Sequence, residues 1–85
     1  MRYTYYTNGT CSTQIDLEVD ENGIIRDVQF TGGCHGNLQG ISVLVRGMSA
    51  SEVVKKFQGI RCGYKNTSCP DQLATALGEI IGRQS

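Results

Sequence analysis

The chain has 85 residues, with eight basic and eight acidic side chains and a formal net charge of zero. A chain this short forms one domain with a modest core, which metal binding or a protein partner commonly reinforces. The neutral charge argues against a nucleic-acid surface, which needs a basic stripe, and the apolar runs are too short to cross a membrane. The first six residues, through Tyr6, contain no apolar signal segment, so we expect a cytoplasmic protein.

The first third of the chain alternates in the manner of β-strands. Residues 2–7 are rich in tyrosine and favour a first strand, and Asn8-Gly9 is a turn signal. Residues 12–19 alternate apolar and polar side chains, as a half-buried antiparallel strand does. A turn over residues 20–23 leads to a third strand over residues 24–30. On that strand we expect Ile24, Val28 and Phe30 to share one face. The predicted inner face of the sheet comprises Ile15, Leu17, Val19, Val28 and Phe30.

A first helix is expected over residues 37–46, where apolar side chains recur at helical spacing, and Gly47 ends it. Gly40 inside this helix costs about 1 kcal/mol relative to alanine, and close packing there would be a reason for it. The recurring apolar side chains are Leu38, Ile41, Leu44, Val45 and Met48.

Two further helices follow. Ser49 and Glu52 form a capping box that begins a helix reaching Phe57, and Pro70 begins a third helix that Gly82 ends. The inward side chains of these two helices are Val53, Val54, Phe57, Leu73, Leu77 and Ile80. The switch from alternation to helical spacing therefore predicts an α+β domain, a three-stranded antiparallel meander followed by three helices on one face.

The four cysteines are Cys11, Cys34, Cys62 and Cys69. Disulfides are not expected in a reducing cytoplasm, which leaves metal binding, redox chemistry or simple burial. No pair has the Cys-x-x-Cys spacing of a zinc knuckle, so the fold must assemble any shared site. Cys34 and Cys69 each precede a predicted helix, whose N-terminus stabilises a thiolate. If both helix starts meet at one end of the sheet, Cys34, Cys62 and Cys69 can hold a soft metal, with Cys11 as a fourth candidate.

The cysteines and the basic side chains also allow functions other than metal binding. The cysteines can equally be buried, reduced thiols, and a nucleophilic cysteine needs a positioned base, for which only His35 is available. Neighbouring residues at a helix start point in different directions, so His35 is not automatically that base. The basic side chains of Lys55, Lys56, Arg61 and Lys65 more commonly solvate a surface than bind phosphate.

Residues 67–71, Thr-Ser-Cys-Pro-Asp, with Gly-Gly-Cys-His-Gly over residues 32–36, resemble the TSCPD domain family along essentially the whole chain, in its small four-cysteine stand-alone branch. Related domains end the adenosylcobalamin-dependent ribonucleotide reductases of DNA synthesis. The resemblance implies an activity by association, that of a ribonucleoside-diphosphate reductase, which is an oxidoreductase that binds nucleotides. Eighty-five residues cannot hold the radical cofactor, substrate barrel and redox cysteines of that reaction, so whether the chain is an enzyme stays open.

A second similarity is to iron–sulfur cluster scaffold proteins. It rests on residues 23–30, on Gly33-Cys34 before a helix, and on Gly47-Met-Ser49 before a short helix. It implies a similar fold and a metal pocket from Cys34, Cys62 and Cys69, although the middle loop is shorter here and Cys11 has no counterpart.

We therefore expect an accessory module that binds zinc, or alternatively an iron–sulfur cluster, through its cysteines. The expected partner is a larger reductase or another protein, and a homodimer stays open. The alternative is a thiol redox module that uses Cys62 and Cys69, or an interaction module whose cysteines are mostly structural.

Overall fold

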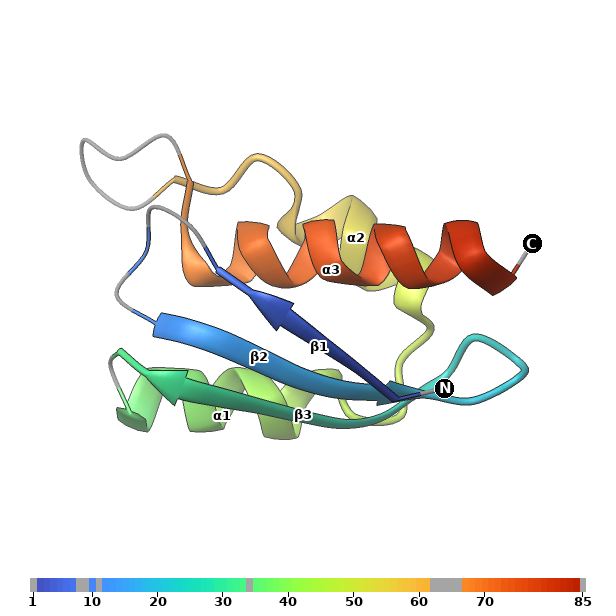
Figure 1. Ribbon diagram of the computed structural model, residues 1–85, viewed down its shortest axis with the longest axis horizontal. Coiled ribbons are helices and arrows are strands. Elements are labelled where there is room, and N and C mark those ends of the chain that lie inside the picture. The colour runs from blue at the N-terminus through green and yellow to red at the C-terminus, as the bar shows by residue number, and fades with distance from the viewer. Residues whose placement is uncertain (1, 8–9, 11, 34, 62–66, 85) are drawn as a thin grey trace.

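The computed structural model of the chain describes residues 2–7, 10, 12–33, 35–61 and 67–84. Within these residues the elements, in chain order, are β1 (Arg2–Tyr6), β2 (Ser12–Val19), β3 (Ile25–Gly32), α1 (His35–Val45), α2 (Ala50–Phe57) and α3 (Cys69–Gln84) (Figure 1). The strands form an antiparallel sheet in the order β1-β2-β3. This architecture confirms the predicted α+β fold, a meander followed by three helices.

The core lies between the helices and one face of the sheet. The alternation in β2 buries Ile15, Leu17 and Val19 against the helices. Polar side chains occupy the opposite face, where the Thr4 hydroxyl donates to the Asp16 carboxylate at 2.7 Å. The helices contribute Val45, Ala50, Val53, Leu73, Ala76, Leu77 and Ile80 to this core.

The predicted core is largely confirmed. Four of the five residues expected on the inner face are buried, and Phe30 packs against the core while partly exposed. Of the predicted helical residues, Ile41 and Phe57 are likewise only partly buried. The buried ones are Leu38, Val45, Val53, Leu73, Leu77 and Ile80.

Strand β3 corrects the expected third strand. Ile25 and Asp27 pair with consecutive residues of β2, so Arg26 is an extra residue that makes a β-bulge. Ile25 is fully buried together with Val28, because the bulge interrupts strict alternation. Ile24, which was expected to share the face of Val28, is only half-buried and lies outside the strand.

Helix α1 differs from its prediction in two ways. It starts at His35, two residues early, and Gly47, at φ +90°, follows its end as expected. Leu44 was wrongly placed on the inner stripe, because its side chain is 67% exposed. A Cβ at Gly40 would have no neighbour within 4 Å among the residues that the structure describes, so close packing against them does not explain this glycine.

The starts of α2 and α3 are close to those predicted. The Ser49 side chain accepts the Glu52 N–H at 3.2 Å, which confirms the cap of α2. Helix α3 begins at Cys69, one residue before Pro70. The expected end at Gly82 is wrong, because the helix continues through this glycine, which lacks a positive φ. Within the described part of the chain, every helix is too short or too polar to span a bilayer.

Candidate functional site at the start of helix α3

The residues Thr67–Asp71 form the start of α3 and its cap. The Ser68 hydroxyl oxygen accepts the backbone N–H of Asp71 at 3.1 Å, and the Ser68 carbonyl accepts the N–H of Gln72 at 2.8 Å. Ser68 therefore occupies the N-cap position, which places Cys69 first in the helix and the Asp71 carboxylate in its first turn. An acidic side chain there is favourable, because it faces the positive end of the helix dipole.

The same motif also fastens the chain that follows α2. One Asp71 carboxylate oxygen, Oδ1, accepts the N–H of Gly59 at 2.7 Å, and the other hydrogen-bonds the Thr67 hydroxyl. The Ser68 hydroxyl donates to the carbonyl of Ile60 at 2.6 Å. Asp71 and Ser68 thus join the backbone at residues 59 and 60 to the start of α3.

Cys69 is buried where α3 meets the sheet. Its side chain is 7% exposed, and its sulfur lies 3.1 Å from the hydroxyl oxygen of Ser12, the first residue of β2. The Thr10 hydroxyl lies 3.2 Å from the same Ser12 oxygen. The thiol therefore sits in a small polar cluster at one end of β2.

Of the four predicted metal ligands, Cys69 is the one that the structure describes; Cys11, Cys34 and Cys62 lie outside the described residues, as does the side chain of His35. Described residues close to each of them in sequence can nevertheless be located. Ser12 pairs with Gly32 across β2 and β3, and it contacts Cys69. Ile60, two positions before Cys62, is bonded to Ser68.

These described residues meet at one end of the sheet. The start of β2, the end of β3 and the start of α3 lie together at the left of Figure 1. They adjoin all four cysteines in the sequence. Ser12 follows Cys11 and Ser68 precedes Cys69, whereas Gly32 precedes Cys34 and Ile60 precedes Cys62 by two positions each.

The sequence model of the TSCPD domain matches residues 1–81. The chain belongs to the TSCPD domain family. No curated protein and no solved structure is detectably similar to the chain. In this TSCPD domain, residues 67–71 form the N-terminus of α3 and its attachment to the preceding loop.

Among the residues that the structure describes, no three His, Cys, Asp or Glu side chains gather closely enough to hold a metal. Cys69 offers a soft sulfur donor, of the kind that zinc and iron–sulfur clusters use. Its burial beside a hydroxyl suits a ligand that is held in one orientation. The donor chemistry at Cys69 therefore fits a thiolate-bound metal, whose remaining ligands would come from cysteines beyond the described residues.

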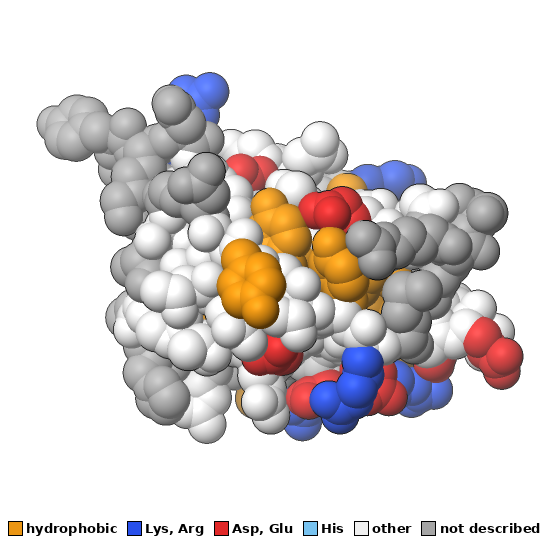
Figure 2. Space-filling view, viewed as in Figure 1, with side chains coloured by type: hydrophobic (Ala, Val, Ile, Leu, Met, Phe, Trp, Pro, Cys, Tyr) orange, Lys and Arg blue, Asp and Glu red, His pale blue; other side chains and the backbone are white. Residues whose placement is uncertain are grey.

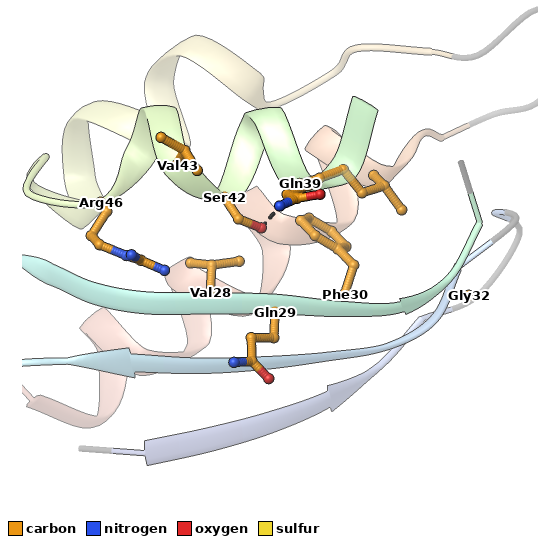
Figure 3. Close-up of a pocket in the computed structure, with 9 residues that line it drawn as sticks. Val28, Gln29, Phe30, Gly32, Gln39, Ser42, Val43 and Arg46 are labelled. Carbon is orange, nitrogen blue, oxygen red and sulfur yellow. Dashed lines mark hydrogen bonds between the residues drawn. The ribbon is translucent and has the colours of Figure 1, made fainter. Parts of the chain in front are cut away.

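A separate groove lies between β3 and α1 of the TSCPD domain (Figure 3). Its volume is about 450 Å³. Arg46 is the ionisable residue among the described residues that line it, and its guanidinium pairs with the Asp27 carboxylate at 3.0 Å. The lining residues are Val28, Gln29, Phe30, Gly32, Leu38, Gln39, Ser42, Val43 and Arg46. The groove could not be predicted from the sequence, because helical spacing does not reveal where α1 packs along β3. Among the described residues that line the groove, the Ser42 hydroxyl donates to the Leu38 carbonyl at 2.9 Å.

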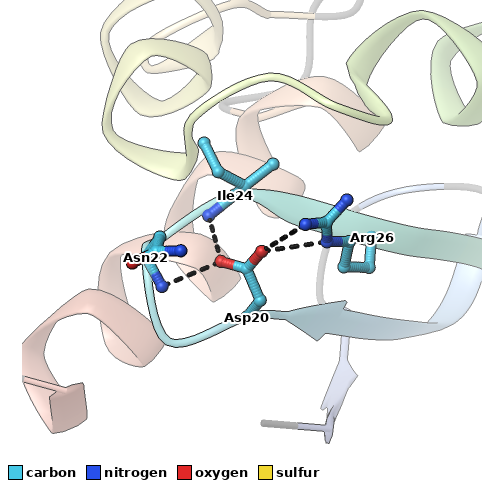
Figure 4. A network of polar contacts seen from close by, with 4 residues as sticks. All are labelled: Asp20, Asn22, Ile24 and Arg26. Carbon is cyan, nitrogen blue, oxygen red and sulfur yellow. Dashed lines mark hydrogen bonds and ion pairs between the residues drawn. The ribbon is translucent and has the colours of Figure 1, made fainter.

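Asp20 organises the turn between β2 and β3 (Figure 4). Its Oδ1 accepts the N–H groups of Asn22 at 2.9 Å and Ile24 at 3.0 Å, and its Oδ2 pairs with Arg26 at 2.8 Å. The hydrogen bond from Ile24, joined by those from Asn22 and Arg26, lowers the pKa of Asp20 below its ordinary value of 3.8. These bonds shape a turn, and we assign this carboxylate a structural role.

The tyrosines of β1 reach toward α3. The Tyr3 hydroxyl donates to the Glu79 carboxylate at 2.8 Å. Burial raises the pKa of Tyr5, and the negative charges of Glu79 and Asp71 raise it further. Figure 2 shows a small hydrophobic patch on this face, with basic and acidic side chains intermixed toward one edge. The contacts bring β1 against the same helix that carries Cys69.

Proposed function

We propose that this TSCPD domain is an accessory module that binds a soft metal through its cysteines at the end of the sheet where α3 begins. Zinc is the proposed metal, and an iron–sulfur cluster is the alternative. The observation that carries the proposal is that described sequence neighbours of all four cysteines meet around Cys69. Cys34, Cys62 and Cys69 would be the ligands, with Cys11 completing a four-thiolate site.

Chain connectivity supports this set of ligands. Consecutive Cα atoms lie about 3.8 Å apart, so a residue two positions along the chain lies within roughly 7.6 Å. Cys11 is one position from Ser12, and Cys34 and Cys62 are each two positions from Gly32 and Ile60. We therefore propose that the other three cysteines share a site with Cys69, since each adjoins a described residue of this cluster in the sequence.

Helix α3 and Ser12 give Cys69 the surroundings of a ligand. The unpaired N–H groups and the dipole at a helix N-terminus stabilise the thiolate, which is the form that binds metal. A bound zinc would supply a cross-link between the sheet and the helices. In a domain of 85 residues, whose core is modest, such a cross-link contributes substantially to folding.

The family association supports an accessory role beside a larger enzyme. Related domains end cobalamin-dependent ribonucleoside-diphosphate reductases, so a reductase of this kind is the proposed partner. The chain is too short to hold a radical cofactor, a substrate barrel and redox cysteines together. We therefore propose that it serves such an enzyme, or another protein, without catalysing nucleotide reduction itself.

Elemental analysis of freshly purified, reduced protein tests the proposal. We expect about one zinc per chain, with zinc–sulfur distances of about 2.3 Å by X-ray absorption. Cys69→Ser should lose the metal, whereas Ser42→Ala, at a buried serine of α1, should retain it. Iron with visible absorption after anaerobic purification would identify a cluster instead. Metal-free protein that also fails to take up added zinc or iron would contradict the proposal.

The second candidate function is a thiol redox or protein-interaction module. Ser68 binds the carbonyl of Ile60, which brings the segment leading to Cys62 to the helix that starts with Cys69, as a redox pair requires. However, Cys69 is 7% exposed, and thiol–disulfide exchange needs access for the attacking thiolate. A reversible midpoint in glutathione buffers, in metal-free protein, would favour this candidate over the metal module.

A further inference from the structure

We propose that the groove between β3 and α1 binds the C-terminal tail of a partner protein, which pairs with β3 as a fourth strand. The groove combines an open sheet edge, an apolar wall and a cation at one end (Figure 3). An added strand makes main-chain hydrogen bonds along such an edge and places alternate side chains in the groove beside it. This role is separate from the proposed metal centre and does not require a bound metal.

Strand β3 has an open edge over residues 28–32. The sheet order β1-β2-β3 gives β3 one neighbouring strand in the described part of the chain. The edge is covered at its start, because the Ile25 N–H donates to the Met48 carbonyl at 2.9 Å and the Ile25 carbonyl accepts the Gly47 N–H at 2.8 Å. An edge strand directs the N–H and C=O groups of alternate residues outward. Beyond the covered start, an added strand can therefore pair with β3.

The groove beside this edge offers apolar surface from both elements. The Phe30 ring rises from β3 toward α1, and Val43 lies on the opposing helix (Figure 3). Phe30 is partly buried and Val43 is 64% exposed, so both have surface that a ligand can cover. The groove volume of about 450 Å³ lies within the range of about 300–1,000 Å³ that ligand pockets have. Alternate side chains of an added strand point to the helix side of the sheet, where burial of apolar groups stabilises binding.

Arg46 provides positive charge at the covered end of the edge. Its guanidinium donates from Nη2 to the Asp27 carboxylate at 3.0 Å, and its side chain is 53% exposed. A guanidinium has five N–H donors, so Arg46 can bind a second carboxylate beside that of Asp27.

This charge sets the direction of the bound segment. Residues 47–49 cover the edge next to Ile25, so a segment antiparallel to β3 stops pairing there with its C-terminal end. A free terminal carboxylate at this end complements the Arg46 guanidinium. A parallel segment would instead bring its N-terminal ammonium group to the same cation, which is unfavourable. The charge therefore favours an antiparallel C-terminal tail.

A second copy of this chain does not fit the same edge. Helix α1 packs against β3 itself. Two β3 strands paired antiparallel would lie about 4.8 Å apart, with both α1 helices on the same face of the joined sheet. Packed helices need about 8–10 Å between their axes, so the two α1 helices would overlap. An extended tail brings no helix, and this difference favours a peptide as the occupant.

Fluorescence anisotropy with synthetic peptides and the full reduced chain tests the proposal. The probes are labelled hexapeptides with a free C-terminal carboxylate, valine, leucine or phenylalanine at alternate positions in either register, and serine between them. We expect saturable binding of at least one hexapeptide. The same peptide with an amidated C-terminus should bind about tenfold more weakly, because it loses a charge-assisted hydrogen bond.

Three substitutions at exposed positions assign the contacts. Arg46→Gln should weaken binding of the free-carboxylate peptide about tenfold and leave the amidated peptide unchanged, so the difference between the peptides disappears. Val43→Ser removes apolar surface from the groove and should weaken both peptides about 3- to 10-fold. Leu44→Ser is its matched control, because Leu44 is 67% exposed on the same helix but lies outside the residues that line the groove. Leu44→Ser should keep wild-type affinity, and circular dichroism verifies that each variant is folded.

Backbone methylation of the peptide tests its pairing with β3. In a paired strand, alternate amides face the neighbouring strand and the others face away from it. Methylating one alternate set of peptide amides should therefore reduce affinity at least tenfold, whereas methylating the other set should be tolerated.

Several results would overturn the proposed docking surface. They are no binding of any hexapeptide, equal binding of both methylated peptides and the unmodified one, and equal weakening by Val43→Ser and Leu44→Ser. Equal affinities of the free and amidated peptides would overturn recognition of a C-terminus. Self-association of the chain in sedimentation, abolished by Val43→Ser, would identify a second copy as the occupant and overturn the peptide. Elemental analysis tests the metal module separately, and neither result decides the other.

Discussion

The sulfur of Cys69 lies 3.1 Å from the hydroxyl oxygen of Ser12, although 57 positions separate the two residues. This contact joins the start of α3 to the start of β2, so the placement of Cys69 depends on the sheet as well as on its own helix. Both side chains are buried, at 7% and 2% exposure. A ligand at this position would thus be held by two elements at once.

Two leucine substitutions, one in α3 and one in α1, test which helix side chains belong to the buried core. Leu77 is fully buried, so Leu77→Ala should lower the free energy of unfolding by about 2–5 kcal/mol. Leu44 is 67% exposed, and Leu44→Ala should change it by less than about 0.5 kcal/mol. Urea denaturation measures both. A loss well below about 1 kcal/mol at Leu77 would show that the inner stripe of α3 is misassigned.

Two glycines of the α1 region should respond oppositely to alanine. Gly40 is helical and open, so Gly40→Ala should stabilise the domain by about 0.5–1 kcal/mol. Gly47 has φ +90°, which alanine adopts only with strain, so Gly47→Ala should destabilise by about 1 kcal/mol. Thermal unfolding followed by circular dichroism compares them. Destabilisation by Gly40→Ala would mean that a contact at this helix position has been missed.

Local patterns predicted those parts of the fold that depend on local interactions. The bounds of β2 follow from uninterrupted alternation, and the start of α2 follows from the pair Ser49 and Glu52. The bulge at Arg26 escaped prediction, because it is defined by pairing with another strand. Leu44 was misassigned because a five-residue apolar stripe is wider than the contact that α1 makes with the sheet.

The candidate site was predicted in part. The position of Cys69 at a helix start follows from the proline and acid after it, and the structure confirms it. The bonds from Asp71 and Ser68 to residues 59 and 60 were not foreseen, because they join segments whose separation the sequence does not reveal. The convergence of all four cysteines stays a prediction, because three of them lie outside the described residues.

The cap of α2 gives a third prediction. The Ser49 side chain accepts the Glu52 N–H at 3.2 Å at the start of an eight-residue helix. Ser49→Ala should lower the free energy of unfolding by about 1 kcal/mol, because the backbone N–H of Glu52 in the first turn loses its acceptor. Lys55→Ala, at an exposed position inside the same helix, is the matched control and should change it by only a few tenths. Equal effects of the two substitutions in urea would contradict the assigned cap.

A pH-dependent prediction follows from the turn at Asp20. Its pKa is lower in the folded chain than the ordinary 3.8, mainly because its carboxylate accepts the Ile24 N–H. The charged form is therefore favoured by folding, and its stabilisation is present above the unfolded pKa and lost as the pH falls through the folded one. The stability difference between wild type and Asp20→Asn should be constant near neutral pH and shrink on acidification.

Urea denaturation at several pH values measures this difference, with Glu21→Gln in the same turn as the control for a change of net charge. Glu21 is exposed, so its substitution should produce a smaller change in the same range. A difference between wild type and Asp20→Asn that stays the same from about pH 6 to about pH 2 would contradict the role of the Asp20 carboxylate.

The last prediction uses two buried serines to separate stability from metal binding. Ser12 contacts the sulfur of Cys69, whereas the Ser42 hydroxyl donates to the Leu38 carbonyl at 2.9 Å inside α1. Each alanine substitution removes one buried hydrogen-bonding group, so each should lower the free energy of unfolding of metal-free protein by about 1 kcal/mol. If Cys69 is a ligand, Ser12→Ala should also weaken zinc binding about tenfold, because the sulfur loses an orienting partner. Ser42→Ala should leave zinc binding unchanged, and competition with a chelator measures both affinities. Equal zinc affinities in the two variants would show that the Ser12 hydroxyl does not orient a metal ligand, and would leave its contact with Cys69 a packing interaction of the fold.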